Sequence, residues 1–199
     1  MATSERIWPW QPKSQELPEG SGTFGLLLFF LSLSILFFAS AVGLVVVRNH
    51  LDPNEATTHS FPLIGWISSV VLLALSGFAQ GTLVAVRRDQ NTIFRLCLVA
   101  TWVLSVLFLI LQIVFWQRLL PEAALQDDVV ESGLYGFFVL TGLHAAHVVG
   151  GMMMQTYITV QGFRGRYWSL RHETVRGTTL YWHFLLGVWV LLVLFLLWL

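Results

Sequence analysis

Three histidines lie within long apolar stretches of this sequence, and they are the side chains best suited to bind a metal. His144 and His147 stand three residues apart, a spacing that puts two rings on nearly one face of a helix. His183 follows in the segment Tyr181-Trp182-His183-Phe184. Two histidines at this spacing, with a third nearby, could in principle hold a metal ion or a haem iron.

The predicted depths of these histidines argue against a shared metal. His147 lies about 13 residues from the inner end of its apolar run, and His183 lies about 5 residues into the next one. At 1.5 Å per residue this is an axial offset of roughly 12 Å. We therefore predict that the histidines are hydrogen-bonded within a helical bundle and that this chain supplies neither metal ligands nor catalytic residues.

The elements that carry these residues are uncharged runs of transmembrane length. Only 11% of the 199 residues are charged and 56% are hydrophobic, whereas soluble domains carry roughly a quarter charged residues. A helix crosses the hydrocarbon core of about 30 Å with roughly 20 apolar residues. Five runs reach that length, at 24–47, 62–86, 96–117, 133–160 and 178–199. The sequence predicts an all-α integral membrane bundle of five transmembrane helices over residues 24–199, preceded by a polar cytoplasmic tail at 1–23.

The orientation follows from the Lys and Arg residues, which favour the cytoplasmic side. Two of them, Arg48 and Arg118, flank the runs on one side. The other side holds Arg6, Lys13, Arg87, Arg88, Arg95, Arg164, Arg166, Arg171 and Arg176. We expect the N-terminus in the cytoplasm and the C-terminus outside. The balanced charge, 11 basic against 11 acidic residues, gives no support for nucleic-acid binding.

Small residues recur every four positions in the fourth run, at Gly142, Ala146 and Gly150. Such a stripe lets a neighbouring helix approach closely, and we predict that it packs within the chain; a dedicated dimer interface is the alternative. No carboxylate lies inside a run, which weakens a transporter or proton-relay function.

The inner ends of the runs favour lipid contact. We expect a group of cations at the cytoplasmic headgroup level, with lipid phosphate as partner; solvated residues without a particular lipid are the alternative. The group comprises Arg164, Arg166, Arg171, His172 and Arg176. Tyr181 and Trp182 are assigned to the same headgroup region, and Trp66, Trp116, Trp182 and Trp198 fit an interfacial belt.

Two motifs resemble subunit III of the haem-copper oxidases. They are Thr141-Gly142-Leu143-His144-Ala145-Ala146-His147-Val148-Val149-Gly150-Gly151 and Tyr181-Trp182-His183-Phe184 with Val188-Trp189 after it. Weaker matches are Phe37-Phe38-Ala39, Leu72-Leu73 to Ser76, and Leu111-Gln112 with Trp116. The resemblance covers residues 24–199. In length and number of predicted helices the chain is similar to the short five-helix bacterial form, which lacks the first two helices of the seven-helix version.

The resemblance implies a non-catalytic accessory subunit in a bacterial cell membrane. Haem and copper would lie in partner subunits, and this chain would pack directly on catalytic subunit I of a respiratory oxidase that reduces oxygen to water. Subunit II and other oxidase subunits, or a larger respiratory supercomplex, are further partners. Phospholipid would bind in a V-shaped cleft between the first two helices and the remainder. Structural or intersubunit roles fall to Thr141, Gly142, His144, Ala146, His147, Gly150, His183 and Trp189. An accessory protein of nitric oxide reductase is the alternative function.

Four carboxylates of the family pattern are missing. Ser34, Phe115, Arg176 and Leu186 stand where the family places or usually places acids. Their joint loss indicates a divergent branch and argues against a role in relaying protons. We also expect His144→Leu or His147→Leu to loosen association with the catalytic subunit without altering its haem content.

Overall fold

Five helices account for almost all of the chain that the structure describes. In this computed structural model the described residues are 21–49, 63–124, 134–167 and 172–198, and no strand occurs among them. The helices are α1 (Ser21–Asn49), α2 (Leu63–Arg87), α3 (Asn91–Ala124), α4 (Leu134–Phe163) and α5 (Glu173–Trp198). The predicted all-α membrane bundle is confirmed, and the described part of each predicted span lies on one helix.

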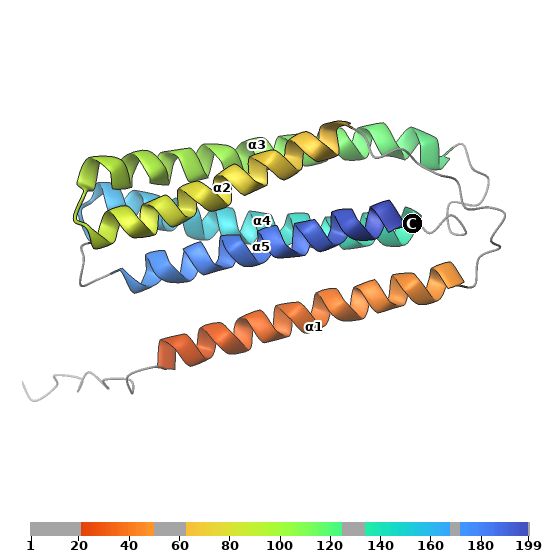
Figure 1. The fold of residues 1–199 in the computed structure, drawn as a ribbon, viewed down its shortest axis with the longest axis horizontal. Helices are drawn as coiled ribbons and strands as arrows, with labels where there is room; N and C mark the ends of the chain where they lie inside the picture. The colour runs from red at the N-terminus through yellow and green to blue at the C-terminus, as the bar shows by residue number, and fades with distance from the viewer. Residues whose placement is uncertain (1–20, 50–62, 125–133, 168–171, 199) are drawn as a thin grey trace, which may run out of the picture.

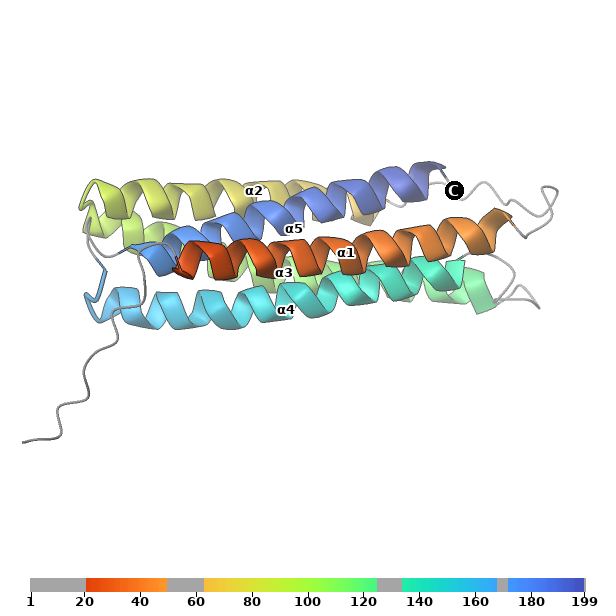
Figure 2. The same cartoon turned by 90° about the horizontal axis from the view of Figure 1, so that it is seen from below.

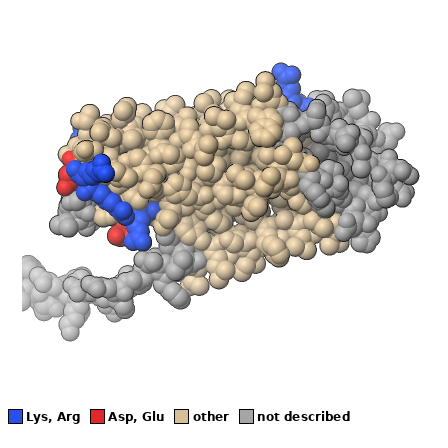
Figure 3. Space-filling model, in the orientation of Figure 1, with Lys and Arg blue, Asp and Glu red and all other residues tan. Residues whose placement is uncertain are grey.

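The surface of the bundle is apolar along its length. Large hydrophobic side chains are exposed on every helix, and the charged side chains in view gather at the two ends (Figure 3). Three helices meet the length and hydropathy of a membrane span over Leu63–Arg87, Asn91–Arg118 and Glu173–Phe195. Such a surface is stable only in lipid, where each helix also satisfies its backbone internally.

The helices alternate in direction, so the α2–α3 turn and the start of α5 lie at the same end (Figure 1). Two helices end there in Schellman motifs, in which a residue with positive φ lets two amides bond back into the last turn. After α2, Asp89 (φ 53) takes that position, and Gln90 N donates to Ala85 O at 3.0 Å. After α4, Gly165 (φ 67) does the same, with Arg166 N donating to Gln161 O at 3.2 Å.

Helices α2 to α5 form a four-helix unit, and α1 lies outside it. The core of this unit contains side chains from all four helices, among them Leu72, Phe108, Val148 and Trp182, each fully buried. Helix α1 contacts α4 and α5 but neither α2 nor α3, and it runs along the seam between its two neighbours (Figure 2). The resemblance implied that the first two helices stand apart from the rest; instead, α2 belongs to the main unit, because it packs closely on α3 and α5.

Candidate functional site

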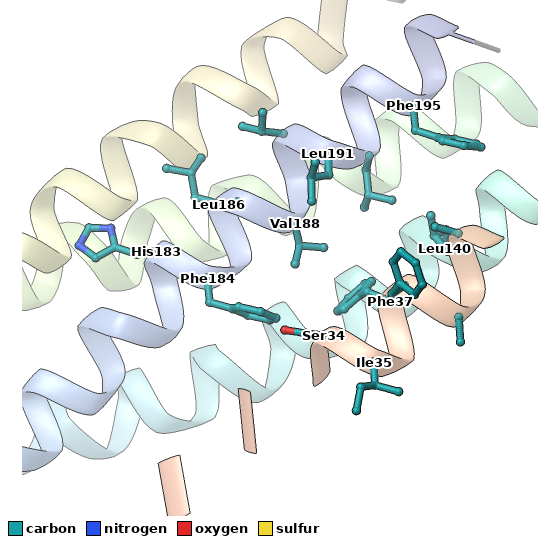
Figure 4. A pocket seen from close by; sticks show the side chains of 16 residues that line it. Ser34, Ile35, Phe37, Leu140, His183, Phe184, Leu186, Val188, Leu191 and Phe195 are labelled. Carbon is teal, nitrogen blue, oxygen red and sulfur yellow. The ribbon is translucent and has the colours of Figure 1, made fainter. Parts of the chain in front are cut away.

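An apolar groove lies between α1 and the four-helix unit. Its volume is about 1230 Å³, and its walls are α1 between Ser34 and Ala41, Leu140 of α4, and α5 between His183 and Phe195. Phe184 points across it toward Ser34 (Figure 4). We call this cavity the α1 groove.

Aromatic side chains hold α1 against its neighbours. Phe30 lies 5.3 Å from Phe184 and stacks on Tyr181 at 6.3 Å, measured between ring centroids. About two turns further along α1, Phe37 lies 5.2 Å from His147 and 6.3 Å from His144. Helix α1 is therefore fixed by rings at these two levels.

The wall of the α1 groove offers no free polar side chain. The hydroxyl of Ser34 donates to Phe30 O at 2.8 Å, within α1 itself. Both ring nitrogens of His183 are already hydrogen-bonded, to Ser76 and to Gln80. The remaining lining residues are apolar, so the groove fits a hydrocarbon chain better than a charged group.

The three predicted histidines do not converge. His183 faces α2, where Ser76 bonds its Nδ1 and Gln80 Oε1 lies 3.2 Å from its Nε2. His147 donates from Nδ1 to Leu143 O at 2.7 Å and faces Phe37 of α1. Within the described residues no three His, Cys, Asp or Glu side chains are grouped to hold a metal ion.

The reason for this separation differs from the predicted one. The α4–α5 contacts of Gly151 with Tyr181 and of His144 with Trp189 place His147 and His183 within about one helical turn of the same depth, closer than predicted from the apolar runs. What separates the two rings is that they lie on helix faces turned to different neighbours.

His144 sits in an aromatic box without a hydrogen bond. The ring is completely buried and lies 5.4 Å from Trp189 and 5.9 Å from Phe108, between centroids. Within the described part of the chain neither of its nitrogens has a hydrogen-bond partner, and the same is true of the amide of Gln112. The predicted hydrogen bonding within the bundle is thus wrong for His144. Because it is buried by its own chain, His144 cannot contact another subunit.

Hydrogen bonds from indole and hydroxyl groups connect the helices of the four-helix unit. Gln155 of α4 joins three of them: its Oε1 accepts from Trp182 Nε1 of α5 at 3.3 Å, and its Nε2 donates to Leu98 O of α3 at 3.2 Å. No role is predicted for Gln155 from the sequence. The sequence does show a polar side chain inside an apolar run, which is the pattern that could have identified it.

Further bonds of this kind involve residues of the predicted structural set. Trp189 donates to Ser69 Oγ of α2 at 3.0 Å. Thr141 accepts from Trp116 Nε1 of α3 at 3.2 Å. Both residues are therefore structural within the chain.

Tyr181 and Trp182 lie inside the bundle, in place of the headgroup contact expected for them. Trp182 is fully buried and Tyr181 is 7% exposed. The Tyr181 hydroxyl donates to His147 O at 2.8 Å, and the Trp182 indole donates to Gln155 Oε1. Both rings are buried because this part of α5 packs on α4 at Gly151, where the absence of a side chain leaves room for them.

The small-residue stripe of α4 does not pack within the chain as predicted. Ala146 and Gly150 are exposed, and a Cβ added at Gly142 would meet no atom within 4 Å. The close approach occurs at Gly151, one residue along, where an added Cβ would lie 2.7 Å from Tyr181 Cε1. Helix α5 contacts the face of α4 that carries Gly151.

Basic side chains gather at the end of the bundle where α2 and α4 end and α5 begins (Figure 3). Arg87 Nε donates to His172 Nε2 at 3.3 Å, and Arg176 lies 3.7 Å from Glu173. Arg164 and Arg166 are exposed at the end of α4. The prediction for Arg171 falls outside the described residues. The described cations lie where headgroups would, and lipid binding by them stays a prediction.

The four positions where the family pattern has acids hold three uncharged side chains and one arginine that is paired with a glutamate. Ser34 and Leu186 line the α1 groove, and Phe115 is buried against Ile64, Trp116 and Phe138. Arg176 is paired with Glu173.

Comparisons with known proteins agree with the fold. The sequence model described as "Cytochrome c oxidase subunit III" matches residues 22–199. A cytochrome c oxidase subunit 3 of Synechocystis sp. is 27% identical over 172 residues, covering 85% of this chain and 72% of the relative. A cytochrome bo(3) ubiquinol oxidase subunit 3 of Buchnera aphidicola is 23% identical over 88% of this chain and 93% of the relative. A heme-copper oxidase subunit I+III of Aeropyrum pernix is 28% identical over 64% of this chain and 16% of that longer protein. Since the family match spans nearly the whole chain, this protein belongs to the cytochrome c oxidase subunit III family.

Proposed function

We propose that this chain is a non-catalytic, lipid-binding subunit of a respiratory haem-copper terminal oxidase in a bacterial cell membrane, and that it stabilises catalytic subunit I. Family membership makes the chain an accessory subunit of a haem-copper oxidase. Haem and copper then belong to its partner subunits. The direct contact with subunit I is supported by the Aeropyrum relative, whose name combines subunits I and III.

The α1 groove is the observation that carries lipid binding. It has about 1230 Å³ of space, an apolar wall and no unpaired polar side chain in that wall. The acyl chain of a phospholipid matches such a lining, because hydrocarbon needs no hydrogen bond. His183 is ten residues from the start of α5, so the α5 wall begins about 15 Å from the basic end of the bundle. With the predicted orientation, the occupant is a chain of an outer-leaflet lipid.

The basic end supplies a second lipid contact in this proposal. His172 and the arginines at 164, 166 and 176 follow the end of α4 or lie near the start of α5, and phosphate groups of the inner leaflet would meet them there. Each cation near an anionic surface contributes about 1 kcal/mol.

The subunit assignment is tested by purifying the complex through a tag on this chain. We expect a haem-copper catalytic subunit in stoichiometric amount and the optical spectrum of an oxidase. Haem with non-haem iron and no copper would instead assign the chain to a nitric oxide reductase, and recovery of the chain without any haem protein would refute the proposal.

Lipid occupancy is tested by filling the groove. Gly187 lines it, and a Cβ added there would meet no atom within 4 Å; Gly187→Phe should therefore fold normally and displace lipid. Gly43→Phe is the matched control, because Gly43 is equally open on α1 but does not line the groove. Native mass spectrometry of the complex should show at least one phospholipid fewer in the first variant only. Equal lipid retention in both variants would refute lipid binding in the groove.

A further inference from the structure

The outward face of α2 carries a polar side chain at membrane depth. This face, which we call the α2 face, consists of Leu73, Gly77, Gln80 and Val84, all exposed and spaced by three or four residues. Gln80 lies seven residues before Arg87 at the end of α2, and hence about 10 Å inside the level of that arginine. Its amide is thus placed within the hydrocarbon layer.

Part of the Gln80 amide has no partner among the residues that the structure describes. Its Oε1 lies 3.2 Å from His183 Nε2, and His183 Nδ1 is bonded to Ser76. If the imidazole donates to Gln80, the two amide hydrogens of Gln80 stay unpaired; if the amide is turned round and donates to the ring, its carbonyl stays unpaired. In either arrangement the series of hydrogen bonds from Ser76 through His183 to Gln80 ends in an unused hydrogen-bonding group on the lipid-facing surface.

The residue beside this group permits a close helix contact. A Cβ added at Gly77 would meet no atom within 4 Å, so a notch without side chain lies one turn from Gln80. Transmembrane helices associate where small residues let backbones approach and where polar side chains bond across the interface. The α2 face has both features, whereas the small-residue stripe of α4 at Gly142, Ala146 and Gly150 shows only the first.

We propose that a transmembrane helix of catalytic subunit I packs along the α2 face, with its backbone over Gly77 and a hydroxyl, amide or carbonyl group bonded to Gln80. The inference rests on the proposed function, which makes subunit I the neighbour. It is supported by the fused Aeropyrum relative, named as subunit I+III. Lipid alone would leave the Gln80 group without a partner in hydrocarbon.

Two kinds of variant test this contact in the complete oxidase. Gly77→Leu fills the notch, where an added Cβ would meet no atom within 4 Å. Gln80→Met removes the polar group at nearly constant shape; Gln80 is exposed, and its hydrogen bond to His183 is lost with it. Gly142→Leu is the matched control, since Gly142 is equally open on α4. We expect the amount of catalytic subunit recovered with each α2 variant to fall about tenfold, with no change in recovery for the control. Loss with Gly142→Leu and full recovery with both α2 variants would overturn the proposal.

Photo-crosslinking identifies the neighbour directly in membranes. Benzoylphenylalanine placed at Leu73 (61% exposed) should form an adduct with subunit I, and the same group at Met153 of α4 (70% exposed) should not. An adduct of the Leu73 variant with a second copy of this chain, or with lipid only, overturns the α2 contact. The wild-type purification separates the two hypotheses, because failure to recover any haem-copper subunit refutes the proposed function itself, and a normal complex without the Leu73 adduct refutes only this inference.

Discussion

Gly151 is the position where the packing of α4 on α5 is most sensitive to added volume. A Cβ there would lie 2.7 Å from Tyr181 Cε1, 3.1 Å from Tyr181 Cδ1 and 3.3 Å from Trp182 Cη2. Carbon atoms in favourable contact are about 3.5 to 4.0 Å apart, so Gly151→Ala forces the Tyr181 ring to move by close to 1 Å. Fully buried Trp182 blocks one direction of that movement.

The cost of this substitution can be worked out from two contributions. Overpacking a well-filled core typically costs about 1 to 3 kcal/mol. Moving the ring also strains the bond from the Tyr181 hydroxyl to His147 O, now 2.8 Å long, and a hydrogen bond contributes about 1 kcal/mol. We therefore expect Gly151→Ala to lower the free energy of unfolding by about 2 to 4 kcal/mol, or roughly thirtyfold or more in the folding equilibrium.

The neighbouring glycine is the matched control. At Gly150 an added Cβ would approach only the Tyr181 hydroxyl, at 3.8 Å, which is an ordinary contact. Unfolding in mixed micelles, followed by tryptophan fluorescence, should therefore show a stability near wild type for Gly150→Ala and a clear loss for Gly151→Ala. A larger loss at Gly150 would show that the stripe of Gly142, Ala146 and Gly150 is the packed face after all, and would refute the placement of α5.

Two further substitutions test the buried polar groups. His144→Leu should leave haem content and association with the catalytic subunit unchanged, because the ring is buried within its own chain. The substitution also removes two unpartnered nitrogens, so the free energy of unfolding should stay the same or rise by about 1 kcal/mol. A changed haem spectrum or a weaker complex would contradict this prediction. Gln155→Leu should destabilise by about 1 to 3 kcal/mol, because it leaves the Trp182 indole without an acceptor. In a double-mutant cycle with Trp182→Phe, measured by the same unfolding assay, the two losses should be less than additive, and strict additivity would show that the two side chains do not interact.

The number and approximate position of the helices could be predicted because lipid imposes one simple requirement. A span must be apolar for about 20 residues, so uncharged runs mark it. The helices extend past those runs: α3 begins at Asn91 and includes Arg95, and α5 begins at Glu173. Helical hydrogen bonding continues into the headgroup region, where charged side chains are solvated, and hydropathy therefore underestimates helix length.

The partners of individual side chains could not be predicted in the same way. Periodicity identified a bare stripe on α4, but the neighbouring helix contacts the face of Gly151. The spacing of His144 and His147 placed them on nearly one face. The His144 ring is nevertheless enclosed by aromatic rings, whereas His147 bonds to the carbonyl oxygen of Leu143 in the preceding turn of α4. In a chain that is apolar on almost every face, hydrophobicity does not distinguish a lipid-facing side from a packed one.

The sequence by itself determined that this protein is a five-helix membrane bundle, and its two motifs resembled one family, because transmembrane length and motif order are read along the chain. Only the tertiary structure decided that α1 stands apart with a groove behind it, that Tyr181 and Trp182 are interior, and that Gln80 faces outward beside Gly77. These features depend on the rotation of each helix about its axis. That rotation is set by how side chains from different helices fit together, and such contacts link residues far apart in the chain.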